Sequence, residues 1–226
     1  MEHRAERTHN QVERADHYER MDRQTLIDTM IRTGAFVFDE TLSCDPKVGK
    51  FAFNHSQNIA DAFVEVVMND ARAIRNDGGS IAIHGMAESL STIVPLVAEG
   101  LQKPGSQVAW SFAYGTGRMG FIPEESKVIV LDTVLCDSET AEARIRNTPF
   151  YPKVAMLAVI LGDKEQEGGS AAYKFRERTN IVAKAIFDAA EVRERKDYLD
   201  GEMSRRIKAM LSETAHGRPP HISRRE

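Results

Sequence analysis

Residues 128–140, with the sequence VIVLDTVLCDSET, carry the strongest structural signal in this chain. The first four residues are apolar and mostly β-branched, which predicts a buried parallel strand. A short polar loop should follow, with Thr140 as the N-cap of a helix over residues 141–145. Asp132 would then lie at the carboxyl end of the strand, which is where open α/β sheets bind their ligands.

Hydrophobic periodicity predicts the remaining elements. Alternating apolar residues predict a small antiparallel ribbon from residues 36–38 and 50–54. Further strands are expected over 80–84, 107–112 and 154–161, and helices over 25–33, 56–75, 92–101, 179–195 and 200–211. Helices that alternate with apolar strands indicate an α/β fold built on a parallel sheet.

Composition limits the class of protein. With 226 residues, 42% of them hydrophobic, the chain can bury one good core, which favours a single α/β domain. A net charge of −4 gives no general attraction to nucleic acid or to acidic membranes. The sequence has no 18-residue apolar run and begins with charged residues, so neither a membrane span nor a signal peptide is expected. The two cysteines, Cys44 and Cys136, lack metal-ligand spacing, which favours a reducing, cytoplasmic location.

The charge pattern divides the chain into three segments. Residues 1–24 are dense in both charges and predict a charged N-terminal arm, either solvated or packed on a partner subunit. Residues 25–195 form the predicted main domain. Residues 196–226 are expected to form a C-terminal helix and a flexible tail.

Three features between residues 84 and 136 have plain structural interpretations. His84 is expected to be a strand-end histidine rather than a catalyst. Gly115, Gly117 and Gly120 form a formal G-x-G-x-x-G, but Phe121-Ile122-Pro123 follows instead of a helix, so no dinucleotide site is predicted. Cys136 has no identifiable base beside it and is expected to pack as a small side chain.

Residues 128–140 resemble the ribose-phosphate-binding signature of the type I phosphoribosyltransferases. In that family an apolar strand runs into two acids that bind the ribose hydroxyls of phosphoribosyl pyrophosphate, and a Thr/Gly-rich loop holds the 5-phosphate. Asp132 matches the first acid, and Thr133 stands where the second would be. Residues 136–140, CDSET, stand where the family has Thr-Thr-Gly-Gly-Thr or a close variant. The motif is therefore degenerate.

Residues 26–36, LIDTMIRTGAF, narrow the resemblance to the orotate phosphoribosyltransferases, which open with a helix, a leu-x-x-thr-gly-ala turn and two hood strands. Gly85 matches the start of the family's pyrophosphate-binding loop. Residues 108–115 correspond to its catalytic loop but lack its cationic residues, and Arg118 is the one nearby cation. The resemblance covers about residues 24–190. It implies a mostly parallel sheet flanked by helices, with a small N-terminal hood.

The resemblance also implies a site. Asp132 is the candidate catalytic residue, because it would bind ribose hydroxyls or stabilise an oxocarbenium-like centre; pairing with an arginine or capping of the next helix is the alternative for this side chain. The ligand-binding candidates are Thr133, Asp137, Ser138, Glu139, Thr140, Gly85 and Arg118, and no metal ligands are predicted. Because Asp137 and Glu139 would repel a 5-phosphate, a nonphosphorylated sugar, a nucleoside or a cationic acceptor fits better than an unaided phosphate.

The functional hypothesis is a diverged phosphoribosyltransferase-like protein of nucleotide metabolism that binds a ribosyl or nucleotide-type ligand around Asp132. It would act as an atypical pentosyltransferase, that is, a (phospho)ribosyl or glycosyltransferase. The alternatives are a noncatalytic regulatory or structural subunit that works through a protein partner, and an ordinary orotate-type enzyme. The resemblance further implies Mg²⁺ with a phosphoribosyl pyrophosphate-like donor, and a homodimer.

Overall fold

The computed structural model describes residues 21–38, 46–104, 107–162 and 169–215. The predicted tail and nearly all of the predicted charged arm lie outside these residues, and the three predicted segments stay predictions. The described part is built around a six-stranded sheet with the order β5-β4-β3-β6-β7-β8. The parallel strands are β3 (Ile81–Gly85), β4 (Ala109–Tyr114), β6 (Lys127–Leu135), β7 (Val154–Gly162) and β8 (Val182–Asp188), and β5 (Gly117–Gly120) runs antiparallel at the edge. The predicted α/β class is confirmed.

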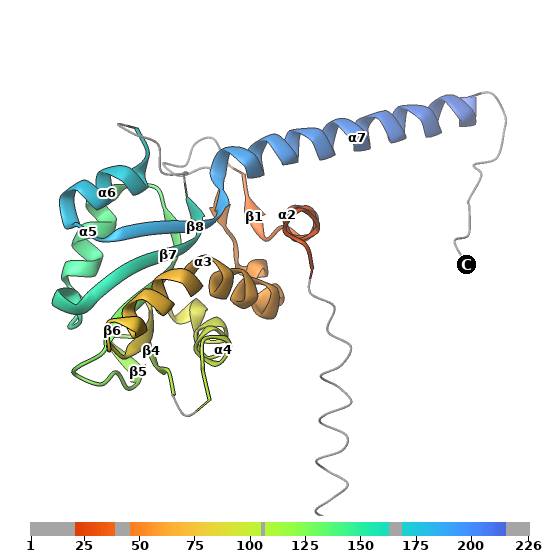
Figure 1. The fold of residues 1–226 in the computed structure, drawn as a ribbon. Coiled ribbons are helices and arrows are strands. Elements are labelled where there is room, and N and C mark those ends of the chain that lie inside the picture. Colours follow the sequence, from red (N-terminus) through yellow and green to blue (C-terminus); the bar gives the residue numbers. More distant parts are fainter. Residues whose placement is uncertain (1–20, 39–45, 105–106, 163–168, 216–226) are drawn as a thin grey trace, which may run out of the picture.

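Helices cover both faces of this sheet (Figure 1). On one face lie α3 (Ser56–Asn76) and α4 (Ile93–Gly100); on the other lie α5 (Ser138–Arg146) and α6 (Ala171–Thr179). Successive side chains of β6 alternate between the two cores, since Ile129 packs in the cluster that contains Phe63 of α3, and Val130 in the cluster that contains Phe175 of α6. Burial on both faces explains why this strand reads as a continuous apolar run.

The N-terminal hood consists of α2 (Arg23–Arg32), β1 (Phe36–Val37) and β2 (Lys47–Val48), with the two strands antiparallel. The predicted ribbon is therefore present, but its second strand is not at residues 50–54. That segment belongs to a 3₁₀ helix (Lys50–His55), in which the N–H of Ala52 donates to the carbonyl of Gly49 and the Ala52 side chain is fully buried. Alternation of large and small residues here comes from one short helical turn rather than from a strand.

The C-terminal region differs most from prediction, because the helix expected over residues 179–195 is two elements. Helix α6 ends at Thr179, and Asn180 adopts a left-handed backbone conformation with a φ of 58°. Strand β8 then pairs with β7 and buries Ile186 and Phe187. Helix α7 (Ala189–Ala215) follows without a loop and runs through Gly201, so the separate helix predicted over 200–211 is the second half of α7.

Helix α7 packs against α2 of the hood (Figure 1). Arg195 donates from Nε and Nη2 to the carboxylate of Asp28 on α2, at 2.5 and 2.6 Å. Arg23 of α2 pairs with Glu191 of α7. The C-terminal half of α7 extends away from the other described elements. Among the helices of the described segments, none combines the length and apolar character needed to cross a membrane.

Candidate functional site

A pocket of about 370 Å³ lies beside the C-terminal part of β6. Strand β6, the first turns of α5 and hood strand β2 contribute its walls, so the pocket lies where an open α/β sheet is expected to bind a ligand. Four predicted site residues line it: Asp132, Thr133, Asp137 and Thr140. The other lining residues are Lys47, Val48, Val134, Cys136, Ala141, Arg144 and Leu157.

Asp132 lies inside β6 rather than at its end, because Val134 and Leu135 continue the pairing with β7. Its side chain is buried and forms an ion pair with Arg144 of α5, with 2.5 Å between Oδ2 and Nη1. Its Oδ1 accepts from the backbone N–H of Thr133 at 2.8 Å. Burial raises the pKa of the Asp132 carboxyl above its ordinary value, and the positive charge of Arg144 acts against this rise. The arginine pairing that the sequence left open is therefore present.

The N-cap of α5 is Asp137, not Thr140 as predicted. The Asp137 carboxylate accepts from the N–H of Glu139 at 3.3 Å, from the N–H of Thr140 at 2.8 Å and from the Thr140 hydroxyl at 2.5 Å. These bonds, led by the Thr140 hydroxyl, hold the pKa of Asp137 below its ordinary value. The first N–H groups of a helix are the donors that an anionic ligand would use, and here a side chain of the protein already occupies them.

The other predicted site residues do not line the pocket. Ser138 is buried, and Glu139 turns toward α6, where it pairs with Arg178 at 2.8 Å. Gly85 lies in the core, where an added Cβ would come within 2.7 Å of the Val94 side chain. Arg118 is on edge strand β5, and its guanidinium lies 5.0 Å from the centre of the Phe150 ring.

Sequence reasoning missed the contribution of Lys47, which brings a cation from hood strand β2 to a pocket wall. Residue spacing gives no signal for this contact, because it depends on how the hood folds back over the sheet. The position of Arg144 in the pocket could be predicted from the sequence, because it follows Thr140 by four residues and therefore lies on the same face of α5. Cys136 is disulfide-bonded, so it is not available as a nucleophile and departs from the reduced thiol expected for it.

The features with plain structural interpretations behave largely as predicted. His84 is buried within β3; its Nδ1 lies 2.9 Å from the Ser111 hydroxyl and its ring packs against Phe150. Burial, with a further effect of the Arg118 charge, lowers the pKa of His84 to about 4. The formal G-x-G-x-x-G spans the β4–β5 hairpin, with Gly120 at a φ of 90°, and no helix follows it. The hairpin therefore lacks the strand–turn–helix arrangement that a dinucleotide-binding motif requires.

The pocket residues do not fit Mg²⁺. This ion is usually held by one or two carboxylates together with substrate phosphates. The carboxylate of Asp132 forms an ion pair with Arg144, and the positive charge of this arginine would oppose a cation beside it. In the part of the chain that the structure describes, His, Cys, Asp and Glu side chains form no group of three that could hold a metal ion.

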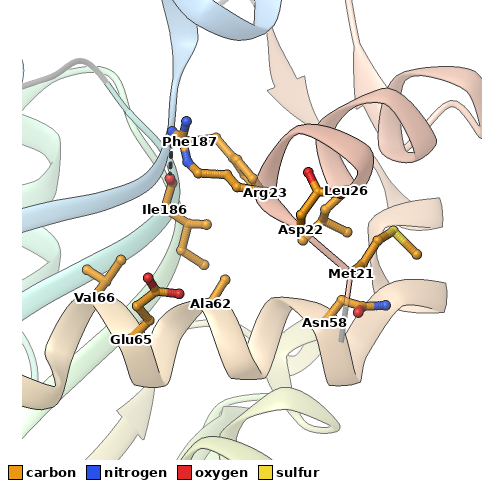
Figure 2. A pocket seen from close by; sticks show the side chains of 10 residues that line it. All are labelled: Met21, Asp22, Arg23, Leu26, Asn58, Ala62, Glu65, Val66, Ile186 and Phe187. Atoms are coloured by element: carbon orange, nitrogen blue, oxygen red, sulfur yellow. Dashed lines mark hydrogen bonds between the residues drawn. The ribbon is translucent and has the colours of Figure 1, made fainter. Parts of the chain in front are cut away.

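A separate pocket of about 450 Å³ lies between α2, α3 and β8 (Figure 2). None of the predicted site residues lines it. Arg23 points to the strand side, where its Nη2 donates to the carbonyl of Ile186 at 3.1 Å, and Asp22 caps α2 through the N–H of Thr25. Arg23 thus joins the hood to the sheet and Asp22 stabilises α2, so both polar groups already have structural roles, and the pocket beside β6 remains the better candidate for a ligand.

The chain has the type I phosphoribosyltransferase fold. It is similar to the solved orotate phosphoribosyltransferase of Francisella tularensis, with 17% identity and a TM-score of 0.52 over 76% of this chain and 89% of that one. The Mycobacterium tuberculosis orotate phosphoribosyltransferase, solved with inorganic phosphate, gives 15% identity and a TM-score of 0.52 over 75% and 97% of the two chains.

The Leishmania donovani UMP synthase gives 11% identity and a TM-score of 0.55 over 87% of this chain and 43% of its own length. No family model matches the sequence, and no curated protein matches it. The similarity therefore establishes the fold, and the expected orotate phosphoribosyltransferase-like architecture is confirmed.

Proposed function

We propose that the pocket beside β6 binds a nonphosphorylated ribosyl ligand of the nucleoside class, and that the chain is a diverged phosphoribosyltransferase-like protein. The observation that carries this proposal is the position of Asp137. Its carboxylate already accepts from the backbone N–H groups of Glu139 and Thr140, so a phosphate at this helix end would meet a negative charge and would find these N–H donors occupied.

The remaining pocket groups suit a ligand rich in hydroxyls. Asp132 offers carboxylate acceptors, and Arg144 and Lys47 offer donors, on facing elements of one pocket. Two acids and two bases leave the lining without a net formal charge, which favours a neutral ligand over a polyanion. A volume of about 370 Å³ falls in the range of small-molecule sites.

Asp132 is the residue that we assign to the ribose hydroxyls. A vicinal diol would donate to Asp132 while accepting from Arg144, and the existing ion pair holds both side chains in place for that contact. In pentosyl transfer from such a ligand, the bond between the ribose and the base would break, the base would leave with the electron pair, and an acceptor nucleophile would form the new bond to the ribose; this would make the protein an atypical transferase. Chromatographic detection of products formed from a bound nucleoside tests the transfer step separately from binding.

The binding test is isothermal titration of the full chain with a panel of nucleosides, with phosphoribosyl pyrophosphate in the presence and absence of Mg²⁺, and with inorganic phosphate. Wild-type protein should bind a nucleoside, and Asp132→Asn should lose that binding at least about tenfold, the effect of about one charge-assisted hydrogen bond. Asp70→Asn is the control for the loss of one ion-paired carboxylate, because Asp70 pairs with Lys184 at 2.7 Å but lies outside the pocket.

Asp137→Asn tests directly whether the charge of the Asp137 carboxylate keeps phosphate away from the N-terminus of α5. Asparagine also caps helices well, so the helix should remain intact while the charge is removed. We expect inorganic phosphate to bind this variant more tightly than wild type. Micromolar affinity of wild-type protein for phosphoribosyl pyrophosphate would overturn the proposal, as would nucleoside binding that Asp132→Asn leaves unchanged.

A further inference from the structure

Cys136 lies in the loop that joins β6 to α5, between the buried Leu135 and Asp137, the N-cap of α5. It lines the candidate pocket and is disulfide-bonded. The sequence contains one other cysteine, Cys44, so a bond within the chain can have only this residue as its second end. Cys44 itself lies outside the described residues, but Lys47, three positions further along the chain, lies within them.

Hood strand β2 brings the chain next to Cys44 to the same pocket. Lys47 and Val48 of β2 line the pocket together with Cys136, and β2 packs on β6 and β7. Three residues of extended chain span at most about 11 Å. A disulfide requires about 4.4–6.8 Å between its two Cα atoms. Because Cys44 is joined so closely to a wall of the pocket that contains Cys136, the two sulfurs are within reach of each other.

The β1–β2 ribbon offers little support for this wall by itself. Each strand has two residues, and Lys47 and Val48 are only half-buried. A two-stranded ribbon is at best marginally stable in water. Beyond the ribbon, the N–H of Gly49 donates to the carbonyl of Ala35 at 2.7 Å. A covalent bond three residues before β2 would therefore contribute strongly to the order of the pocket wall.

The rest of the hood is held without this bond. Ile27 and Met30 of α2 and Phe36 of β1 are buried in the core that the hood shares with α3 and the sheet. Opening the disulfide would therefore leave the hood folded and loosen β2. Cys136 is half-buried, so the thiolate of a reductant can reach its sulfur.

We propose that Cys136 and Cys44 form a reversible disulfide that couples β2 to the β6–α5 loop and sets how firmly Lys47 is held at the pocket. In the reduction, a thiolate of a dithiol attacks one sulfur and the S–S bond breaks. The second thiol of the reductant then resolves the mixed disulfide, so that both cysteines end as thiols and the dithiol ends as a disulfide. The effect on a ligand rests on the proposed function, whereas the bond and its effect on β2 do not.

Tryptic peptide mapping of the full chain, purified without reductant and alkylated, tests the bond. Cleavage at lysine and arginine gives peptides 33–47 and 128–144, each of which contains one cysteine. Mass spectrometry should find these two peptides linked to each other, and separate after treatment with dithiothreitol. Peptides that are unlinked before reduction would overturn the proposal, as would peptide 128–144 linked to a second copy of itself.

Hydrogen exchange measured by mass spectrometry tests the coupling. Amides of β2 and of the first turn of α5 should exchange at least about tenfold faster after reduction, because the covalent tie between them is lost. Cys44→Ser should exchange like the reduced wild type. Cys44→Ser combined with Cys136→Ser is the matched control and should not respond to dithiothreitol. Equal exchange of β2 in the oxidised and reduced wild type would overturn the proposal.

Titration with adenosine and uridine as probes measures the consequence for the pocket. The oxidised protein should bind about five- to tenfold more tightly than the reduced protein, because Lys47 is already held in place. Equal affinity of the two forms would overturn the coupling of the disulfide to the pocket. A protein that binds neither probe in either form would refute the proposed function, and the exchange measurement, which needs no ligand, would then decide this inference by itself.

Discussion

Replacement of Arg144 by methionine should destabilise the protein in a strongly pH-dependent way. Methionine keeps an apolar stem of similar length but removes the partner of the buried Asp132 carboxylate. Breaking a fully buried ion pair from one side costs about 3–5 kcal/mol. The Arg144 side chain is 42% exposed, so water can replace part of the pairing, and we expect a loss of about 1–3 kcal/mol in the free energy of unfolding at pH 7–8.

The pH dependence follows from the pKa of Asp132. Burial already raises this pKa in the folded protein, and loss of Arg144 would raise it further. The folded state then binds a proton more readily than the unfolded chain, so the stability of the variant should fall as the pH rises through the folded pKa. Toward pH 4 Asp132 becomes protonated in the folded variant, and the difference from wild type should shrink.

Urea unfolding of wild type, Arg144→Met, Asp132→Asn and the double variant, each from pH 4 to pH 8, measures the effect. The double variant should recover most of the loss at pH 8, because no buried charge is left without a partner. Arg146→Met is the control on the same helix, since Arg146 pairs with Glu142 at the surface. A loss that is equal at every pH, or a double variant no more stable than Arg144→Met, would refute the reasoning.

Three further predictions concern His84, Gly120 and Phe175. The His84 ring should titrate near pH 4 by NMR. Because its pKa is lowered in the folded state, the contribution of His84 to stability should be lost as the pH falls from 6.5 to about 4. A ring that titrates near pH 6.5 would contradict the argument that burial lowers this pKa. Gly120→Ala should lower the free energy of unfolding in urea by about 2–3 kcal/mol, because φ is +90° and the new Cβ would lie 2.3 Å from the carbonyl oxygen of Trp110. Gly117→Ala is the control and should change this free energy little, because its new Cβ would lie 3.8 Å from the nearest atom. Phe175→Ala should cost about 3–5 kcal/mol in the same assay, because the ring is fully buried, and a loss below about 1 kcal/mol would show that the core under α6 is loosely packed.

The sequence predicts the sheet well where burial on both faces leaves an unbroken apolar run. Strands β6 and β7 show this, as Val128 to Leu131 and Val154 to Leu161 are almost entirely apolar. Strand β8 escapes prediction because Lys184 interrupts its apolar residues. Lys184 pairs with Asp70 of α3, a tertiary contact that makes a charge acceptable at the sheet and that local periodicity cannot reveal.

The candidate site was likewise predictable where its residues are close in the sequence and unpredictable where they depend on tertiary contacts. Proximity along the chain brings Asp132, Thr133, Asp137 and Thr140 into one pocket, since they belong to one strand–loop–helix unit. Sequence spacing does not show that Glu139 turns to Arg178 instead, because that depends on how α5 packs against α6.

The hydrogen bonds between Asp28 and Arg195 join residues 167 positions apart. A ribosome that adds 5–20 residues per second needs roughly 10 to 30 s to supply the second partner after the first. During this interval α2 exists without α7, and the side of α2 that carries Asp28 is open to solvent and to other nascent chains. Completion of the hood is thereby a late event of biosynthesis.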